Sequence, residues 1–321
     1  MATPPPTPKT QERTKPMWPL RTMLFIPAHK LDWAKKVDRF APDSVVIDIE
    51  DALPRSMKVE GRAMAREMIA VLKEKGVPAF VRVNALSDIG MDDVPEIVTD
   101  GLAGIMLPKS DSVEEIRTLD RLISYGEGKA GMPFGSVAIL PLPETARGMV
   151  ATREMAAASD RCRGVIGLMG GPIIGDFARA AGFLPTMEGS EQFYLASKMI
   201  LDSRAGGAPY PMASLIGTGL DDLDGVRMLA ERAKRFGFVG AVLIHPSHVK
   251  VAAEVFVPTR EEAQYFAGMI DAMAAAEARG DSAVRYEGTM VDYAMLPHAH
   301  DIVDEATRRG ILPATAAGEA A

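Results

Sequence analysis

The chain has 321 residues, of which 47% are apolar and 25% charged, with a formal net charge of −7. These proportions are typical of a globular protein with one large core or two domains, and the negative charge argues against non-specific binding of nucleic acid. A single cysteine, Cys162, excludes a disulfide within the chain, and no apolar run approaches the roughly 20 residues that a membrane helix needs. We therefore predict a cytoplasmic protein that binds neither nucleic acid nor membranes.

β and α signals alternate along the chain from residue 22 to residue 258. Short, nearly continuous apolar runs predict strands that are covered on both faces, as in a parallel sheet. The runs are 22–26, 44–49, 79–83, 104–107, 137–142, 164–169, 213–217 and 240–244. Between them, amphipathic stretches such as 58–73 and 222–236 repeat apolar residues at helical spacing. Strands that alternate with helices in this number predict an α/β fold, the (β/α)8 TIM barrel, which typically takes about 250 residues.

A doubly wound open sheet is the alternative for the same pattern. That fold usually carries a G-x-G-x-x-G turn after its first strand, and no such segment follows residue 26. We therefore expect a barrel at 17–258 with helices appended at 259–312. Residues 1–16, rich in Pro, Thr and Lys and without the apolar core of a secretory signal, predict a disordered tail. The Ala-rich residues 313–321 predict a frayed one.

Polar residues follow most of the predicted strands, and in a barrel these positions share one mouth, where enzymes of this fold place catalytic groups. They are Pro27 and His29 after the first strand, Asp48, Glu50 and Asp51 at the second, Arg82 and Asn84 at the third, Lys109 after the fourth, Glu144 after the fifth, Asp176 after the sixth and His245 after the eighth. A lone strand-end acid is more often a helix cap or a solvated loop residue, and a histidine before a proline is more often structural. Their shared position at one mouth nevertheless favours a functional site, with acids that can hold a cation and bases that can hold an anionic substrate.

The segment I-L-P-L-P-E-T-A-R-G-M at 139–149 contains the strongest single signal. An apolar strand ends in two prolines and presents Glu144 just before a helix opens at Thr145. The loop after the next strand delivers Asp176, and two acids from adjacent strand ends can share one divalent cation. Carboxylates with open positions for water suit Mg²⁺ or Mn²⁺, whereas zinc is disfavoured because the histidines lack metal-ligand spacing. We therefore predict a Mg²⁺ site, with Mn²⁺ as an alternative, at Glu144 and Asp176.

A cation at this position would allow a specific type of chemistry. It can chelate a 2-oxo acid through one carboxylate oxygen and the carbonyl oxygen, acting as a Lewis acid and a template. Arg82 can then stabilise negative charge on oxygen while a carbon–carbon bond breaks or forms. A general acid/base must still exchange a proton with the carbon of the enolate, and the barrel residues alone do not identify one.

Ordered segments of the chain resemble the citrate lyase beta-subunit/malyl-CoA lyase family of Mg²⁺-dependent acyl-CoA lyases, within the HpcH/HpaI aldolase–citrate lyase superfamily. They are R-T-M-L-F-I-P at 21–27, V-V-I-D-I-E-D-A at 45–52, V-R-V-N at 81–84, M-L-P-K at 106–109, E-T-A-R-G at 144–148, G-D-F-A-R-A-A-G at 175–182, L-I-H-P-S-H-V at 243–249 and E-G-T-M-V-D at 287–292. Each segment is weak alone, but their order and spacing from about residue 21 to residue 303 are specific.

The resemblance implies a barrel of the phosphoenolpyruvate/pyruvate-binding type that forms homotrimers or homohexamers. Glu144 and Asp176 match the family's two Mg²⁺ ligands, and Arg82 matches the arginine that contacts the carbonyl of the oxo acid. Asp292 matches the catalytic acid/base that a C-terminal helix carries into the site of the neighbouring subunit. The resemblance thus supplies the missing proton carrier and implies that oligomerisation completes the site.

The resemblance also implies roles for the remaining strand-end residues. Asp48, Glu50 and Asp51 match an acidic motif that supports the metal-bound waters and the barrel mouth. Lys109 and the loop after the first strand, which contains Pro27 and His29, lie where the family handles the acyl-CoA.

The leading hypothesis is a carbon–carbon lyase that cleaves a malyl-, citramalyl- or citryl-type 3-hydroxyacyl-CoA into an acyl-CoA and a 2-oxo acid, reversibly. A CoA-independent class II pyruvate aldolase is a second hypothesis. Members of that group resemble one another in a D-x-E-H segment after the second strand, in which the histidine serves as the base. This chain has Asp51 in place of that histidine, which counts against the hypothesis. A third is a non-catalytic paralogue, motivated by a loop before Asp176, G-P-I-I-G-D at 171–176, that is longer than in the family.

Overall fold

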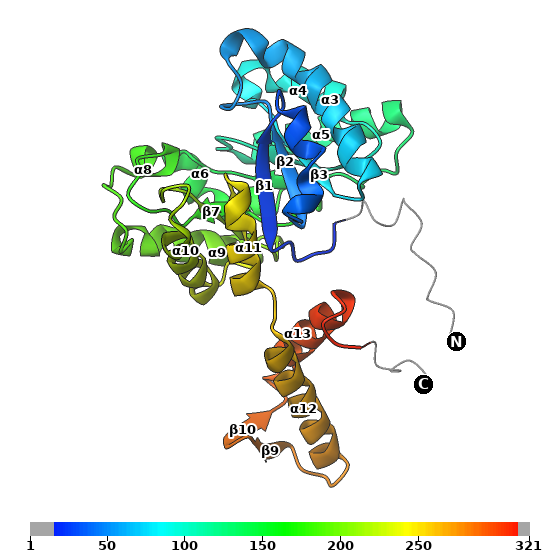
Figure 1. Cartoon of the computed structure of the whole chain (residues 1–321), viewed down its shortest axis with the longest axis vertical. Helices are drawn as coiled ribbons and strands as arrows, with labels where there is room; N and C mark the ends of the chain where they lie inside the picture. The colour runs from blue at the N-terminus through cyan, green and yellow to red at the C-terminus, as the bar shows by residue number, and fades with distance from the viewer. Residues whose placement is uncertain (1–15, 314–321) are drawn as a thin grey trace. The chain divides into compact units, whose positions relative to one another are not determined.

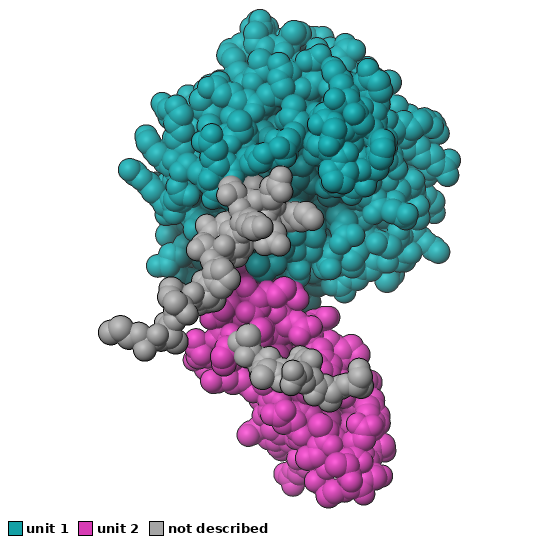
Figure 2. All heavy atoms as spheres, turned by 90° about the vertical axis from the view of Figure 1, so that its right-hand side faces the viewer, with its two compact units in different colours: residues 1–256 teal, residues 257–321 magenta. Residues whose placement is uncertain are grey.

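The computed structural model describes residues 16–313, in two compact units that divide between Phe256 and Val257 (Figure 1, Figure 2). The first unit contains a parallel sheet, and each of its strands overlaps the run predicted for it. The strands are β1 (Thr22–Pro27), β2 (Ser44–Asp48), β3 (Ala79–Arg82), β4 (Leu102–Leu107), β5 (Ala138–Pro141), β6 (Ile166–Leu168), β7 (Met212–Leu215) and β8 (Gly240–Leu243). The tails predicted at 1–16 and 313–321 lie outside the described residues, apart from Pro16 and Pro313.

The order of the strands identifies the fold as a barrel. Hydrogen-bonded neighbours run β5-β4-β3-β2-β1-β8-β7-β6, so consecutive strands lie side by side and β1 pairs with β8. An isolated parallel bridge between Ile139 of β5 and Cys162, just before β6, joins the two ends of this order. The (β/α)8 barrel is therefore confirmed. The doubly wound alternative is wrong, because in that fold the strand order reverses and the sheet stays open.

Helices follow the strands, and Figure 1 shows α3, α4 and α5 grouped on the outer side of β1–β3. They are α2 (Leu31–Ala34), α3 (Lys58–Glu74), α4 (Met91–Ile97), α5 (Val113–Ala130), α6 (Ala146–Val150), α7 (Thr152–Ala156), α8 (Asp176–Ala181), α9 (Phe193–Ala205), α10 (Leu223–Phe236) and α11 (Pro246–Phe256). The helices predicted at 58–73 and 222–236 are confirmed as α3 and α10. Between residues 16 and 313, no helix has both the length and the apolar character needed to cross a lipid bilayer.

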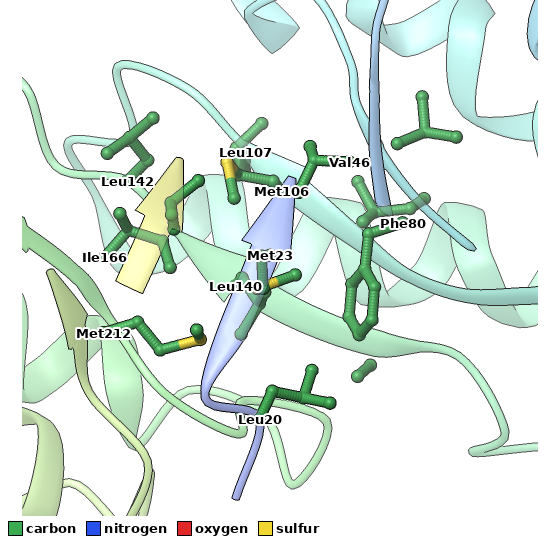
Figure 3. Packing of buried hydrophobic residues seen from close by; sticks show 14 of the residues in the cluster. Leu20, Met23, Val46, Phe80, Met106, Leu107, Leu140, Leu142, Ile166 and Met212 are labelled. Atoms are coloured by element: carbon green, nitrogen blue, oxygen red, sulfur yellow. The ribbon is translucent and has the colours of Figure 1, made fainter. Parts of the chain in front are cut away.

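Apolar side chains fill the interior of the barrel. β2, β4, β5 and β8 are buried along their whole length. Met23, Met106, Leu140 and Met212 come from four different strands and are fully buried, and Figure 3 shows such side chains pointing into the space that the strands enclose. Because the interior is packed, the ends of the strands remain for function.

The second unit has a small core of its own, made of Met269, Met273, Val291 and Ala299. It consists of α12 (Arg260–Glu277), β9 (Ala283–Tyr286), β10 (Thr289–Asp292) and α13 (Leu296–Arg308), and α12 packs along α13 and against β9. The predicted helices are confirmed, but the β9–β10 hairpin was not predicted. Its strands have only four residues each, with a single buried side chain between them, and they contain no apolar run that would reveal them.

Candidate active site

Charged residues from the ends of several strands meet at one end of the barrel. We call them the mouth cluster, and they are Asp48, Glu50, Asp51, Arg82, Lys109, Glu144 and Asp176. Hydrogen bonds and ion pairs connect all of them, so these strand-end residues lie together as the barrel arrangement predicts.

Arg82, the last residue of β3, is held in a fixed orientation. Its guanidinium donates two parallel hydrogen bonds to the buried carboxylate of Asp48, with Nε 3.0 Å from Oδ1. Asp48 also accepts a hydrogen bond of 2.9 Å from the backbone N–H of Glu50, and the ring of Phe25 lies 4.8 Å from the guanidinium carbon of Arg82. A bidentate pair of this kind restricts the arginine geometrically, so Asp48 positions Arg82 as well as shaping the loop after β2.

Lys109 bridges the acids of the cluster. Its ammonium donates a hydrogen bond to Oε1 of the buried Glu50 and lies 3.6 Å from Asp51 Oδ2 and 3.5 Å from Asp176 Oδ2. Although burial acts to lower it, the pKa of Lys109 is raised by the hydrogen bond and charge of Glu50 and by the nearby aspartates. Lys109 has a φ of 50°, in the left-handed region that a non-glycine residue seldom occupies. The other oxygen of Glu50, Oε2, is buried without a hydrogen bond, although Arg82 Nη1 lies 3.3 Å away.

Glu144 is a partly buried carboxylate in a position that disfavours its charge. Burial raises the pKa of Glu144 to about 7, and the charges of Glu50 and Asp176 add to this effect, while those of Arg82 and Lys109 oppose it. Its Oε2 accepts a 3.4 Å hydrogen bond from the backbone N–H of Lys109. The next residue, Thr145, caps α6 by accepting a hydrogen bond of 2.9 Å from Gly148 N–H, so the predicted helix start is confirmed.

Asp176 opens α8 and lies within the cluster despite the long loop that precedes it. Its Oδ1 accepts a hydrogen bond of 2.6 Å from Arg179, one turn later on α8. Burial acts to raise the pKa of Asp176, but the hydrogen bond from Arg179 and the charge of Lys109 bring it below its usual value. Asp176 and Glu144 line the same small cavity, so residues 171–175 do not separate the two acids.

The acids fit a hard divalent cation. Burial raises the pKa of Glu144 and the charges of Glu50 and Asp176 add to that rise, so a divalent cation held by Glu144 and Asp176 would favour their ionised forms. Among residues 16–313, no three or more His, Cys, Asp and Glu side chains are grouped as a metal site. Two carboxylates with waters completing the coordination are typical of Mg²⁺, which dehydrates reluctantly. Glu144 and Asp176 would therefore hold the ion, leaving positions for water or substrate.

Other strand-end residues lie outside the cluster. Pro27 pairs with Asp48 in the β1–β2 register, whereas His29 is exposed two residues further on. Asn84 is buried and donates its amide N–H to Asp93 Oδ2 at 2.7 Å, so it anchors α4. His245 Nδ1 lies 2.6 Å from the hydroxyl of Ser247, which agrees with a structural role. No hydrogen bond or ion pair recorded within the described range connects His29, Asn84 or His245 to the mouth cluster.

Asp292 is the last residue of β10, in the second unit, whereas the mouth cluster is built from the first. The expectation that a helix carries Asp292 is wrong, because Asp292 belongs to a strand. Its Oδ1 accepts a hydrogen bond of 3.0 Å from Ala294 N–H. The neighbouring side chains Met290, Tyr293 and Met295 are all exposed.

Three contributors to the site were missed in the sequence. Phe25, under Arg82, reads only as part of an apolar strand. Arg179 could have been identified, because a residue three positions after Asp176 on a helix faces it. Gln192 holds the loop after β6 through two hydrogen bonds with the backbone of Gly170, at 3.0 and 2.9 Å. No motif or apolar pattern in the neighbouring sequence indicates this role.

The family model for HpcH/HpaI aldolase/citrate lyase matches residues 21–246. The citrate lyase subunit beta-like protein of Deinococcus radiodurans is 32% identical over 290 residues, covering 88% of this chain and 96% of that protein. The L-malyl-CoA/beta-methylmalyl-CoA lyase of Cereibacter sphaeroides is 30% identical over 311 residues, covering 91% of this chain and 96% of that protein.

Solved structures share the fold over almost the whole chain. A citrate lyase of Burkholderia xenovorans LB400 superimposes with a TM-score of 0.77 at 20% identity, covering 94% of this chain and 97% of that one. The protein CitE of Mycobacterium tuberculosis, in complex with magnesium, acetoacetate and coenzyme A, gives a TM-score of 0.64 at 25% identity, covering 90% and 99% respectively. With the family model matching over two thirds of its length, the chain belongs to the HpcH/HpaI aldolase/citrate lyase family.

Proposed function

We propose that this protein is a Mg²⁺-dependent carbon–carbon lyase that cleaves a 3-hydroxyacyl-CoA of malyl, citramalyl or citryl type into an acyl-CoA and a 2-oxo acid, reversibly. The observation that carries the proposal is the meeting of Glu144 and Asp176 with an oriented Arg82 at one barrel mouth. A relative named as an L-malyl-CoA/beta-methylmalyl-CoA lyase, and a solved relative with magnesium and coenzyme A, support the same chemistry.

The residues of the chain divide the work of this reaction. A bound Mg²⁺ would supply Lewis acidity at the oxygens of the 2-oxo acid. Glu144 and Asp176 would hold it, and Arg82, fixed by Asp48, would donate hydrogen bonds to the oxygen on which negative charge develops. Lys109 would hold Glu50, Asp51 and Asp176 close together during the reaction. Its contacts with these three acids support this role more directly than a contact with the acyl-CoA.

Proton transfer to and from the enolate carbon requires a further group, and we assign it to Asp292. Its surroundings support delivery to another surface, because the flanking side chains Met290, Tyr293 and Met295 are apolar and exposed. We place Asp292 at the site of a neighbouring subunit in a homo-oligomer, a trimer or a hexamer. Mixing Asp292→Ala subunits with Glu144→Ala subunits should then restore part of the activity. Demonstrably mixed oligomers without activity would remove the shared site.

A lyase assay on malyl-, methylmalyl-, citramalyl- and citryl-CoA tests the whole proposal. We expect Mg²⁺-dependent release of a 2-oxo acid from one of these thioesters, and loss of that release with EDTA. No release with Mg²⁺ still bound would favour a CoA-independent aldolase. No release and no Mg²⁺ binding would favour a non-catalytic paralogue.

A further inference from the structure

A cavity of about 730 Å³ lies at the end of the barrel opposite the mouth cluster. Its wall includes Leu102 and Ala138, the first residues of β4 and β5, and Trp18, which precedes β1. The amino ends of the parallel strands lie opposite the carboxyl ends that carry the mouth cluster, and the two sets of residues do not overlap. Cavities of about 300–1,000 Å³ are of the size that binds small organic molecules.

Arg163 presents a charged group to this cavity. Its backbone is fixed on both sides, because its N–H donates to the carbonyl of Ile139 at 3.2 Å and its carbonyl accepts from Tyr210 N–H at 3.0 Å. The guanidinium carbon lies 5.9 Å from the ring centroid of Trp18 and 5.8 Å from that of Tyr210, and these two rings are stacked. Within residues 16–313, no hydrogen bond or ion pair of this guanidinium is recorded. Its N–H groups are therefore available to an acceptor on a ligand, while the rings restrain it.

The other charged residues of the wall favour a ligand with a single negative charge. Arg161 already donates all its guanidinium N–H groups to other protein groups. Asp100 forms an ion pair with Lys73, and Asp160 is exposed. A ligand with several negative charges would meet two acids and only the charge of Arg163 to compensate it, whereas one carboxylate is compensated fully.

The loop from α5 to β5 gives the cavity an apolar wall, made of Met132, Pro133 and Phe134. Phe134 is 75% exposed, yet the loop that carries it is held in place. The N–H of Ser136 donates to the carbonyl of Pro133 at 3.2 Å, and the hydroxyl of Ser136 donates to Glu127 Oε1, also at 3.2 Å. An aromatic ring held in this way can cover the apolar part of a ligand.

We propose that this cavity is a second binding site, for an organic monocarboxylate with an apolar or aromatic body. The carboxylate accepts a pair of hydrogen bonds from the guanidinium of Arg163, and the body packs against Trp18 and Phe134. Neither Mg²⁺ nor any residue of the mouth cluster takes part. The site is therefore independent of the proposed lyase reaction, and either proposal can fail without the other.

The two tryptophans of the chain can locate the binding, because Trp18 precedes β1 and lines the cavity, whereas Trp33 lies on α2, after the carboxyl end of β1. In a Trp33→Phe protein with EDTA present, 4-phenylbutyrate should change the emission of Trp18 saturably. The neutral 4-phenylbutyramide should bind at least about tenfold more weakly, because it lacks the charge that Arg163 recognises. No saturable change, or equal affinities for the acid and the amide, would overturn the proposal.

Variants of the cavity give a second readout, by calorimetry. Arg163→Met should lower the affinity for 4-phenylbutyrate at least about tenfold, and Phe134→Ala about threefold or more. Arg153→Met is the matched control and should bind as the wild type does, because Arg153 is exposed and does not line the cavity. Urea unfolding verifies that each variant folds. An unchanged affinity in folded Arg163→Met protein, or in Phe134→Ala protein should the first variant not fold, would show that the acid does not bind in this cavity.

Discussion

Two clusters of buried charge lie in the same barrel and are bonded differently. The mouth cluster has a counterpart where β5 meets the segment before β6, which we call the seam cluster: Asp120, Ser124, Glu127 and Arg161. There Arg161 donates every guanidinium N–H, to Asp120, Ser124, both oxygens of Glu127 and the carbonyl of Val137, over 2.6–3.1 Å. In the mouth cluster, by contrast, Glu50 Oε2 has no hydrogen bond.

The two clusters also shift the pKa of a glutamate in opposite directions. Burial acts to raise the pKa of Glu127, yet the hydrogen bonds from Arg161 and from the backbone of Val137 and Gly135 bring it below its usual value. Burial raises the pKa of Glu144 to about 7, without comparable hydrogen bonds to oppose it. The same residue types therefore stabilise a fold where every polar atom is paired, and remain available to a ligand where some are not.

The largest expected effect is on activity at the mouth cluster. Glu144→Gln and Asp176→Asn each remove a charge that we assign to Mg²⁺, so kcat/KM should fall at least about 10³-fold, or about 4 kcal/mol of transition-state stabilisation. Calorimetry should show weakened Mg²⁺ binding while urea unfolding shows a folded protein. Full activity in either variant would remove that residue as a ligand.

The seam cluster should respond in the opposite sense, in stability and not in chemistry. Arg161→Met leaves the fully buried Glu127 without its partner and should lower the free energy of unfolding by about 3–5 kcal/mol, measured in urea. Arg121→Met, which breaks an exposed ion pair with Glu114 on the same helix, should leave the free energy of unfolding nearly unchanged. If the two variants lost equal stability, the seam cluster would not be the structural element described here.

The pH dependence of the free energy of unfolding should reveal the raised pKa of Glu144. The pKa of Glu144 is higher in the folded protein than in the unfolded chain, so the folded state binds more protons between pH 4.5 and about 7. Stability without metal should therefore fall across that window in the wild type relative to Glu144→Gln, with a difference of up to about 3 kcal/mol above pH 7. Parallel pH profiles for the two proteins would contradict the shift.

The smallest expected effect concerns Lys109, whose ammonium group lies among the acids of the mouth cluster. Lys109→Met removes the hydrogen bond to Glu50 and should lower the free energy of unfolding by about 1–3 kcal/mol in the absence of metal. Added Mg²⁺ should stabilise this variant more than the wild type, because the acids repel one another more strongly without the ammonium. Thermal unfolding with and without Mg²⁺ measures the difference, and identical metal-induced shifts would argue that Lys109 does not neutralise these acids.

Much of the mouth cluster could be predicted because a barrel converts position along the chain into position in space. The carboxyl ends of parallel strands meet at one mouth, so the sequence alone groups Asp48, Arg82, Lys109 and Glu144. The seam cluster could not be predicted in this way. Glu127 and Arg161 are 34 residues apart, lie on a helix and in a loop, and no periodicity connects them.

The sequence alone determined the strands, their barrel arrangement and the acids at the mouth, because buried parallel strands require short, nearly continuous apolar runs, which here end in prolines or charged residues. Only the tertiary structure decided which polar atoms remain unpaired, that a short hairpin carries Asp292, and that a small cavity adjoins Glu144 and Asp176. These features depend on packing between segments distant along the chain. Local composition does not encode such contacts, since the same loop residues would read identically whether they lined a cavity or faced solvent.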